Sequence, residues 1–174
     1  TVSEFEPYMA KTIGLWHDKF LPGLRELTSE VHKHGAKIIP QMAHPGPESL
    51  SPYFYGTDTM GPSPVMCHTT KKMCQEMSIE QIQATVVEFG EAARRAREAG
   101  FDGIELHAAH SYMLVGSFLS GLRNRRSDRY GGTIEARLQL ALEIIQSVHQ
   151  RAGADFPIVM RISDIIQAFP FLIL

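Results

Sequence analysis

The sequence contains few of the residues that build metal clusters or disulfide frameworks. It has two cysteines in 174 residues, Cys67 and Cys74, and residues 68–73 separate them. This spacing lacks the Cys-x-x-Cys pairs of zinc and iron–sulfur sites, so no metal site is expected there. A disulfide between the two cysteines is an alternative. Because Thr1 opens straight into polar sequence without a signal peptide, we instead expect reduced thiols in a cytoplasmic protein.

The sequence also lacks a strong charge of either sign and a long apolar run. The formal net charge is −2, and acidic residues accompany the basic ones. Two basic clusters are therefore predicted to be solvated faces or ion-paired loops: Arg94, Arg95 and Arg97, and Arg123, Arg125 and Arg126. The longest apolar run, residues 168–174, is far shorter than the roughly 20 residues of a membrane-spanning helix. Neither nucleic acid nor a membrane is expected as a partner.

The chain length suits a single domain. Domains most often have roughly 100 to 150 residues, whereas a complete eight-stranded α/β barrel takes about 250. The chain has 174 residues, of which 44% are hydrophobic and 21% charged. These fractions are typical of globular proteins and exclude a disordered chain.

Predicted helices and strands alternate along the chain, with glycine between them. Helices are predicted over residues 21–35, 78–100 and 133–153, and strands over residues 36–42, 102–107 and 156–163. Ser78 and Gln81 form a capping box for the second helix, and Thr133 can cap the third. Helical spacing predicts these buried faces: Leu21, Leu24, Leu27 and Val31; Ile82, Val86, Phe89, Ala93 and Ala96; Leu138, Ala141, Leu142, Ile145 and Val148. Residues 44–77 form a long loop, which is often functional when it follows a strand.

Polar residues stand near the carboxyl ends of all three predicted strands. The alternation of strands and helices predicts βαβ units, which form a parallel sheet with right-handed crossovers. Gln41, His107 and Arg161 should then meet at one edge of that sheet, where ligands of such folds bind. A single residue at such a position is more often a hydrogen-bonded structural residue than a catalyst, and the shared position of the three is what favours a site.

The short stretch after the second strand suggests two kinds of chemistry. His107 and His110 could be metal ligands, but the only third ligand to nominate is His44. Alternatively, two imidazoles could donate hydrogen bonds to one carbonyl oxygen and stabilise enolate-like charge. Tyr112 would then be a proton donor to carbon, or else an aromatic residue packed in the loop.

Five stretches in order resemble one protein family. They are "QMAHPG", "GFDGIELHAAHSY", "NRRSDRYGGT", "EARLQLALEII" and "FPIVMRIS". Together they resemble the old yellow enzyme family of FMN-dependent NADH:flavin oxidoreductases, which includes 2,4-dienoyl-CoA reductases and clostridial 2-enoate reductases. The resemblance runs from about Leu21 to Ser163.

The resemblance implies a (β/α)8 barrel with FMN on its C-terminal face, of which this chain would contain about strands 3 to 5. Gln41 would hydrogen-bond the flavin pyrimidine edge, and Arg161 would lie against the flavin N1–C2 region. His107 and His110 match the family's pair that binds the substrate carbonyl. Tyr112 matches the tyrosine that protonates the alkene carbon. NADH or NADPH would be the reductant.

The sequence departs from the family at several points. Pro47 stands where Arg is usual, Ser111 where Gly is frequent, and Gly121 where Pro is usual. None of these changes removes a predicted catalytic group. Residues 164–174 form an atypical apolar tail. The loops after the last two barrel strands, which hold the FMN phosphate in the family, are not expected in this chain.

Two functions therefore compete. Residues 1–174 would be part of an FMN-binding barrel domain of an oxidoreductase that reduces an enone, enoate or enoyl thioester. Alternatively, the chain would be an inactive fragment that needs a partner chain or further segments to bind flavin, and that self-associates through open sheet edges. A self-contained doubly wound domain is disfavoured, because no glycine-rich phosphate-binding sequence follows any predicted strand.

Overall fold

The computed structural model describes residues 1–9 and 12–162. The predicted apolar tail, residues 164–174, and Ser163 lie outside the described residues. The elements are η1 (Asp18–Phe20), α1 (Leu21–Lys33), β1 (Gln41–Met42), η2 (Gly46–Glu48), α2 (Ser51–Phe54), β2 (Met60–Gly61), β3 (Gln75–Glu76), α3 (Ile79–Glu98), β4 (Ile104–Ala108), α4 (Leu114–Leu119), α5 (Ile134–Ala152) and β5 (Ile158–Ile162). Within these ranges, no helix is long and apolar enough to cross a bilayer.

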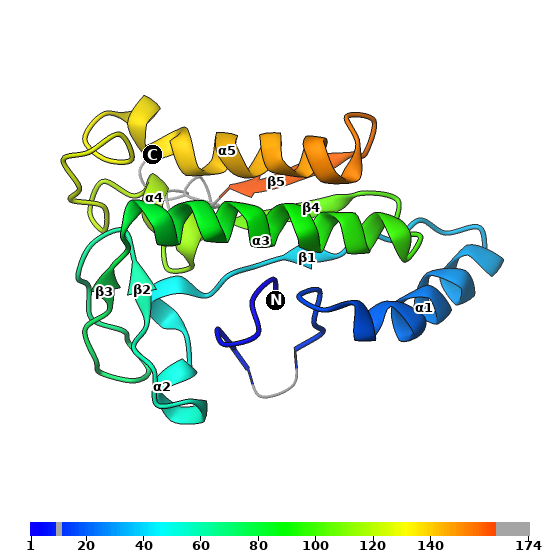
Figure 1. Cartoon of the computed structure of the whole chain (residues 1–174), viewed down its shortest axis with the longest axis horizontal. Coiled ribbons are helices and arrows are strands. Elements are labelled where there is room, and N and C mark those ends of the chain that lie inside the picture. The colour runs from blue at the N-terminus through cyan, green and yellow to red at the C-terminus, as the bar shows by residue number, and fades with distance from the viewer. Residues whose placement is uncertain (10–11, 163–174) are drawn as a thin grey trace, which may run out of the picture.

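The central sheet is parallel, as predicted. Its strand order is β1-β4-β5, with α3 connecting the first pair and α5 the second. Figure 1 shows α3 and α5 side by side across one face of this sheet. Helices on one face of a parallel sheet are the arrangement found in a segment of an α/β barrel.

Side chains of the central strand alternate between the two faces of the sheet. Ile104 and Leu106 of β4 belong to the hydrophobic core, whereas Glu105 and His107 project the opposite way. We call this opposite side of the sheet the open face, because α3 and α5 do not cover it. The register places Gln41 of β1 beside Glu105, and Arg161 of β5 beside His107. The open face therefore gathers polar residues.

The two long helices begin where their capping residues predict. Ser78 Oγ accepts a hydrogen bond from the Gln81 backbone N–H at 3.2 Å, and the Gln81 side chain accepts one from the Ser78 N–H at 2.8 Å. The reciprocal capping box before α3 is therefore confirmed. Thr133 Oγ1 accepts a hydrogen bond from the Ala136 N–H at 3.3 Å and caps α5. Gly153 ends that helix with φ of 98°, a conformation that favours glycine.

The core lies between these helices and the sheet. The whole predicted face of α3 is buried, with Ile82, Phe89, Ala93 and Ala96 all at 0% exposure. Burying a side chain such as Ile82 or Phe89 contributes about 1.5–3 kcal/mol to stability. The two helices approach closely at Gly90, where a Cβ atom would collide with the Ser147 side chain of α5.

The predicted faces of α1 and α5 are only partly correct. Leu142 is 55% exposed, because α5 packs on α3 and α4 through a face that contains Leu140 and Ile144 instead. Leu27 of α1 is 38% exposed. Helical spacing identifies the apolar residues of a helix, but it does not specify which of them have neighbours.

The first predicted strand is shorter than expected. Residues 36–40 are not in a strand, and only Gln41 and Met42 pair with β4. Ile39 is 41% exposed and, with Leu27, lines an apolar cavity of about 260 Å³. No described element fills that cavity, which explains why these two apolar residues remain accessible.

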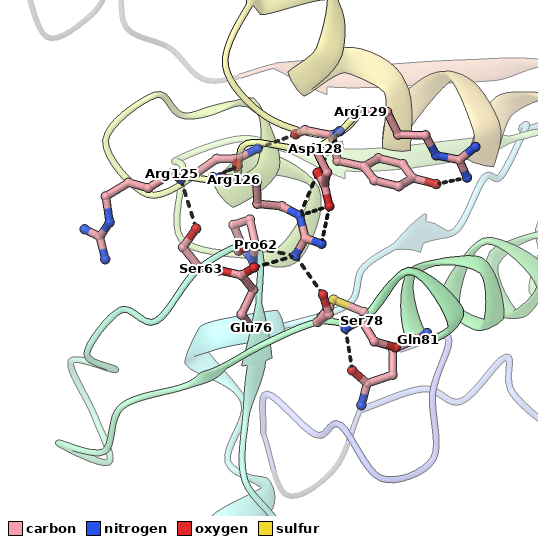
Figure 2. Close-up of polar contacts among 12 residues, drawn as sticks. Pro62, Ser63, Glu76, Ser78, Gln81, Arg125, Arg126, Asp128 and Arg129 are labelled. Atoms are coloured by element: carbon pink, nitrogen blue, oxygen red, sulfur yellow. Dashed lines mark hydrogen bonds and ion pairs between the residues drawn. The ribbon is translucent and has the colours of Figure 1, made fainter.

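The long loop after β1 is ordered by contacts with the basic loop before α5. Arg126 is only 8% exposed, and its guanidinium donates hydrogen bonds to Pro62 O at 3.2 Å and Met77 O at 2.7 Å. It also pairs with Asp128 at 2.6 Å (Figure 2). The predicted ion-paired loop is confirmed, but Arg126 is buried rather than solvated. It connects segments that are about 50 to 64 residues apart in the sequence.

The basic residues of α3 form ion pairs at the surface, as predicted. Arg94 pairs with Glu98 at 2.6 Å, and Arg95 pairs with Asp18 at 2.6 Å. Exposed pairs of this kind contribute about 0–1 kcal/mol each. The basic cluster on α3 is therefore an ion-paired surface.

Both cysteines are buried and free. The Cys67 thiol donates to Glu48 Oε2 at 3.3 Å, and the Cys74 thiol donates to Ser63 O at 3.2 Å. The alternative of a disulfide is therefore wrong. Burial raises the pKa of the Cys74 thiol, which keeps that group protonated at neutral pH.

Candidate active site

The five predicted site residues surround one cavity on the open face. Gln41, His107, His110, Tyr112 and Arg161 all line this cavity, which has a volume of about 510 Å³. Its size falls in the range of small-molecule sites. Parallel strands place their carboxyl ends at one edge, and this placement brings together residues that are up to 120 positions apart.

His107 is the central residue of the cavity. Its side chain projects from β4 and is 5% exposed, and neither ring nitrogen has a hydrogen-bond partner among the described residues. Burial lowers the pKa of His107, and the nearby Arg161 and His110 lower it further. The ring is therefore neutral near pH 7, with one N–H donor and one acceptor. Leaving a buried donor or acceptor unpaired costs about 1–3 kcal/mol, so the arrangement favours a ligand that supplies the partner.

A strained turn after β4 positions the next two residues of the site. His110 and Ser111 have φ values of 68° and 55°, in the left-handed region that non-glycine residues seldom occupy. The Ser117 hydroxyl donates to Ser111 O at 3.2 Å and holds this turn. The His110 ring then stacks on the Tyr112 ring at 5.7 Å with an interplanar angle of 7°. Such strain is typical of functional turns.

Tyr112 lies against both histidines and a second tyrosine. Its ring centroid is 6.5 Å from that of His107, and 6.3 Å from that of Tyr8, on which it stacks. Burial raises the pKa of Tyr112, and the Tyr8 phenol raises it further. The Tyr112 phenol is therefore protonated near pH 7 and has a proton to donate. The structure shows an aromatic residue that is both packed and next to the proposed carbonyl-binding pair.

Gln41 and Arg161 lie on the open face at either side of β4. Both side chains are exposed, and the Gln41 amide donates a hydrogen bond to the Glu105 carboxylate. An amide and a guanidinium that point into the same open space fit a polar ring edge. The side chains of Gln41 and Arg161 lie on the face of the sheet opposite to α3 and α5.

The N-terminal segment contributes residues that the sequence analysis missed. Five of its side chains line the cavity: Thr1, Tyr8, Met9, Thr12 and Ile13. The Val2 N–H donates to Ala43 O at 3.3 Å, which holds this segment beside β1. The segment has no helical or strand periodicity, so its position could not be predicted from the amino-acid pattern.

His44 does not support the metal alternative. It is 2% exposed, and its Nδ1 accepts a hydrogen bond from the Gly46 N–H at 3.0 Å. Burial lowers the pKa of His44 to about 4. Within residues 1–9 and 12–162, no three His, Cys, Asp or Glu side chains are placed to hold a metal ion. His44 acts instead as a structural residue of the loop after β1.

Comparison with known proteins identifies the family of the chain. A model of the NADH:flavin oxidoreductase / NADH oxidase family matches residues 4–168. The chain belongs to this family. Its members are oxidoreductases that use FMN with NADH or NADPH as reductant, which supports the expected cofactors.

Individual relatives show how much of a family member the chain represents. An NADH oxidase of Thermoanaerobacter brockii is 42% identical over 146 residues, which are 84% of this chain and 22% of that protein. The chain thus spans about a fifth of the length of the curated relatives that it matches.

Solved structures give the same result for the fold. An old yellow enzyme homologue from Zymomonas mobilis superposes with a TM-score of 0.83 and 26% identity, over 92% of this chain and 47% of that one. A 2-naphthoyl-CoA reductase in complex with 2-naphthoyl-CoA gives a TM-score of 0.84 and 28% identity, over 92% and 26%. The expected fold class, an incomplete segment of an α/β barrel, is therefore confirmed.

Proposed function

We propose that this chain carries the substrate-activating residues of an FMN-dependent ene-reductase. In this reaction, NADH or NADPH reduces the flavin, and an α,β-unsaturated carbonyl compound receives the hydride. The observation that carries the proposal is the position of His107. This buried imidazole has no hydrogen-bond partner among the described residues, and it lies beside a protonated tyrosine in one cavity. Residues 1–174 would form part of the FMN-binding barrel domain.

His107 and His110 would bind the substrate carbonyl oxygen. His107 has a neutral ring and offers one N–H donor, and the ring of His110 lies 6.2 Å away between centroids. A substrate oxygen between them would accept hydrogen bonds from both rings. These donors matter most when hydride addition places negative charge on that oxygen, because they are already oriented and partly shielded from water.

Tyr112 would supply the proton that completes the reduction. Hydride adds to one alkene carbon, the phenolic proton adds to the other, and the substrate leaves as the saturated carbonyl compound. The raised pKa of Tyr112 keeps its proton in place until an enolate-like carbon base is present. The stack with His110 orients the phenol ring.

Gln41 and Arg161 are the residues of this chain that would hold FMN. The Gln41 amide can donate to and accept from the pyrimidine edge, and the Arg161 cation can stabilise negative charge at N1–C2 of the reduced ring. FMN supplies the hydride when bound. Both side chains are exposed on the open face, which leaves them accessible to a flat ring.

Unsaturated carbonyl compounds, including enones, enoates and enoyl thioesters, are the substrates that this site chemistry fits. One relative of known structure binds 2-naphthoyl-CoA, which is an unsaturated thioester. A carbonyl conjugated to the reacting double bond is required, because the two histidines act through its oxygen. Cytoplasmic location remains a prediction from the reduced cysteines.

One observation favours the alternative, an inactive fragment. The described sheet has two edges, β1 and β5, and Gln41 and Arg161 on these strands are exposed. A closed barrel has no such edges. The 174-residue chain expressed alone should therefore bind FMN weakly or not at all, and should self-associate.

Two measurements separate the proposals. Size-exclusion chromatography of the 174-residue chain, with absorbance in the visible band of oxidised flavin, tests whether the chain alone binds FMN and whether it self-associates. A yellow, monodisperse monomer would contradict the fragment alternative. For the enzyme, the FMN-loaded full-length protein should oxidise NADH or NADPH and reduce cyclohexenone. Flavin reduction without any enone reduction would contradict the ene-reductase assignment.

A further inference from the structure

A second cavity lies next to the proposed active site. It has a volume of about 360 Å³, and its lining includes Glu48, His68, Thr69 and Arg123. It shares Tyr8, His110 and Tyr112 with the main cavity. A molecule that binds beside these aromatic rings can therefore extend from one cavity into the other.

The shared wall is a stack of three rings. Tyr112 lies between His110, at 5.7 Å, and Tyr8, at 6.3 Å, and the interplanar angles are 7° and 26°. Flat ring faces of this kind contact unsaturated and aromatic groups well. The part of the substrate that passes this wall is accordingly expected to be flat and largely apolar.

The far wall of the second cavity is rich in hydrogen-bond donors. Both terminal nitrogens of Arg123 donate to the same Glu48 oxygen, each at 3.2 Å. A guanidinium has five N–H groups in a fixed fork, so further donors of Arg123 remain for another acceptor. The side chains of His68 and Thr69 are exposed on the same cavity and can also donate.

The negative partner of Arg123, Glu48, also lines the cavity, but both of its oxygens are already occupied by donors. The second Glu48 oxygen accepts hydrogen bonds from the Cys67 thiol at 3.3 Å and from the His68 backbone N–H at 3.0 Å. The Glu48 side chain is 7% exposed, whereas that of Arg123 is 19% exposed. The cationic side chain of this ion pair is thus the more exposed of the two, and it retains donors for another acceptor, although Glu48 belongs to the same lining.

We infer that the second cavity binds an anionic group of the substrate, with Arg123 as the cation that pairs with it. This inference rests on the proposed function. It narrows the substrate class to unsaturated carbonyl compounds that carry a carboxylate, or a similar anion, at the end remote from the reacting double bond. A flat linker would lie along the ring stack between the two groups. Arg123 would set specificity through binding and would take no part in hydride or proton transfer.

The test compares two substrates that differ in one charge. Benzalacetone and its para-carboxylate share the reacting enone and a flat ring. In the FMN-loaded full-length protein, the para-carboxylate should have the lower KM. Arg123→Gln should raise that KM by about 10-fold to 100-fold, the range for a lost charged hydrogen bond, and leave kcat and the values for benzalacetone unchanged. An equal effect on both substrates, or none, would overturn the inference.

Matched variants control for charge and folding. Arg125→Gln removes the same charge from the same loop, but Arg125 donates to Pro64 O at 2.6 Å and lines neither cavity. This variant should therefore leave KM and kcat unchanged for both substrates. Arg123→Lys should retain part of the preference for the para-carboxylate. If Arg123→Gln leaves Glu48 unpaired and fails to fold, the double variant Glu48→Gln/Arg123→Gln removes both charges. The double variant should show the same rise in KM for the para-carboxylate.

A binding measurement separates this inference from the proposed function. Calorimetric titration of the oxidised protein with the saturated analogues of both ketones requires no turnover. If neither benzalacetone nor its para-carboxylate is reduced, the proposed ene-reductase activity fails. Tighter binding of the carboxylate analogue that depends on Arg123 would still support the anion site. Equal binding of both analogues would overturn it, even in an active enzyme.

Discussion

The two faces of the β1-β4-β5 sheet differ in polarity, packing and hydrogen bonding. Towards α3 and α5, residues such as Ile104 and Leu106 are at most 1% exposed and belong to a continuous core. On the open face, Gln41 and Arg161 are exposed. His107 is buried there, and neither of its nitrogens has a hydrogen-bond partner in the described part of the chain. The covered face supplies stability. The open face holds polar groups at a cost in stability and makes them available to ligands.

This difference predicts that substitutions on the two sides have separable effects. Changes at the open face should alter reaction rates and leave the free energy of unfolding almost unchanged. Changes at the covered face should lower the free energy of unfolding and leave the reaction rates of the folded protein almost unchanged.

The largest effect is expected at Tyr112. Tyr112→Phe retains the ring that stacks on His110 but removes the proton, so alkene reduction should slow by about 10² to 10⁴. Flavin reduction by NADH or NADPH should be retained. Stopped-flow measurement of the two half-reactions in the full-length protein checks this. A variant as fast as the parent would mean that another group or a water molecule delivers the proton.

The next effect is on stability and belongs to the covered face. Phe89 of α3 is 0% exposed, so Phe89→Ala should destabilise the fold by about 3–5 kcal/mol through lost burial and a new cavity. Val87→Ala on the same helix is the control, because Val87 is 44% exposed. Urea unfolding followed by circular dichroism measures both. An equal, small loss in the two variants would contradict the assigned core.

The smallest effect is expected at the start of α3. Ser78→Ala removes the cap on the Gln81 N–H and should cost about 1 kcal/mol. Ser127→Ala in the basic loop removes an exposed hydroxyl and should lie within about 0.5 kcal/mol of the parent. The same urea titrations apply. A cap variant indistinguishable from the Ser127 variant would show that tertiary contacts alone fix the start of α3.

The covered face was largely predictable from the sequence. The capping box of Ser78 and Gln81 and the glycine after α5 are local signals, and they gave the helix limits to within two residues. The convergence of Gln41, His107 and Arg161 was also predictable, because parallel strands end at one edge of a sheet.

Features that depend on contacts between distant segments were not predictable. The stack of Tyr8 on Tyr112 and the burial of Arg126 join residues far apart in the sequence that follow no period. The left-handed backbone at His110 and Ser111 was equally hidden, because neither residue is glycine. Leu142 was misassigned because spacing alone does not reveal which flank of a helix has neighbours.

The most direct test of the account is the rate of enone-dependent flavin reoxidation in the His107→Ala variant of the full-length protein, measured beside its urea midpoint. The account predicts a rate about 10²-fold lower, the typical cost of losing one oriented donor to a developing oxyanion. It also predicts an unchanged or higher midpoint, because the variant removes two buried nitrogens that have no described partner. A parent-like rate would remove His107 from the mechanism and contradict the functional assignment of the open face.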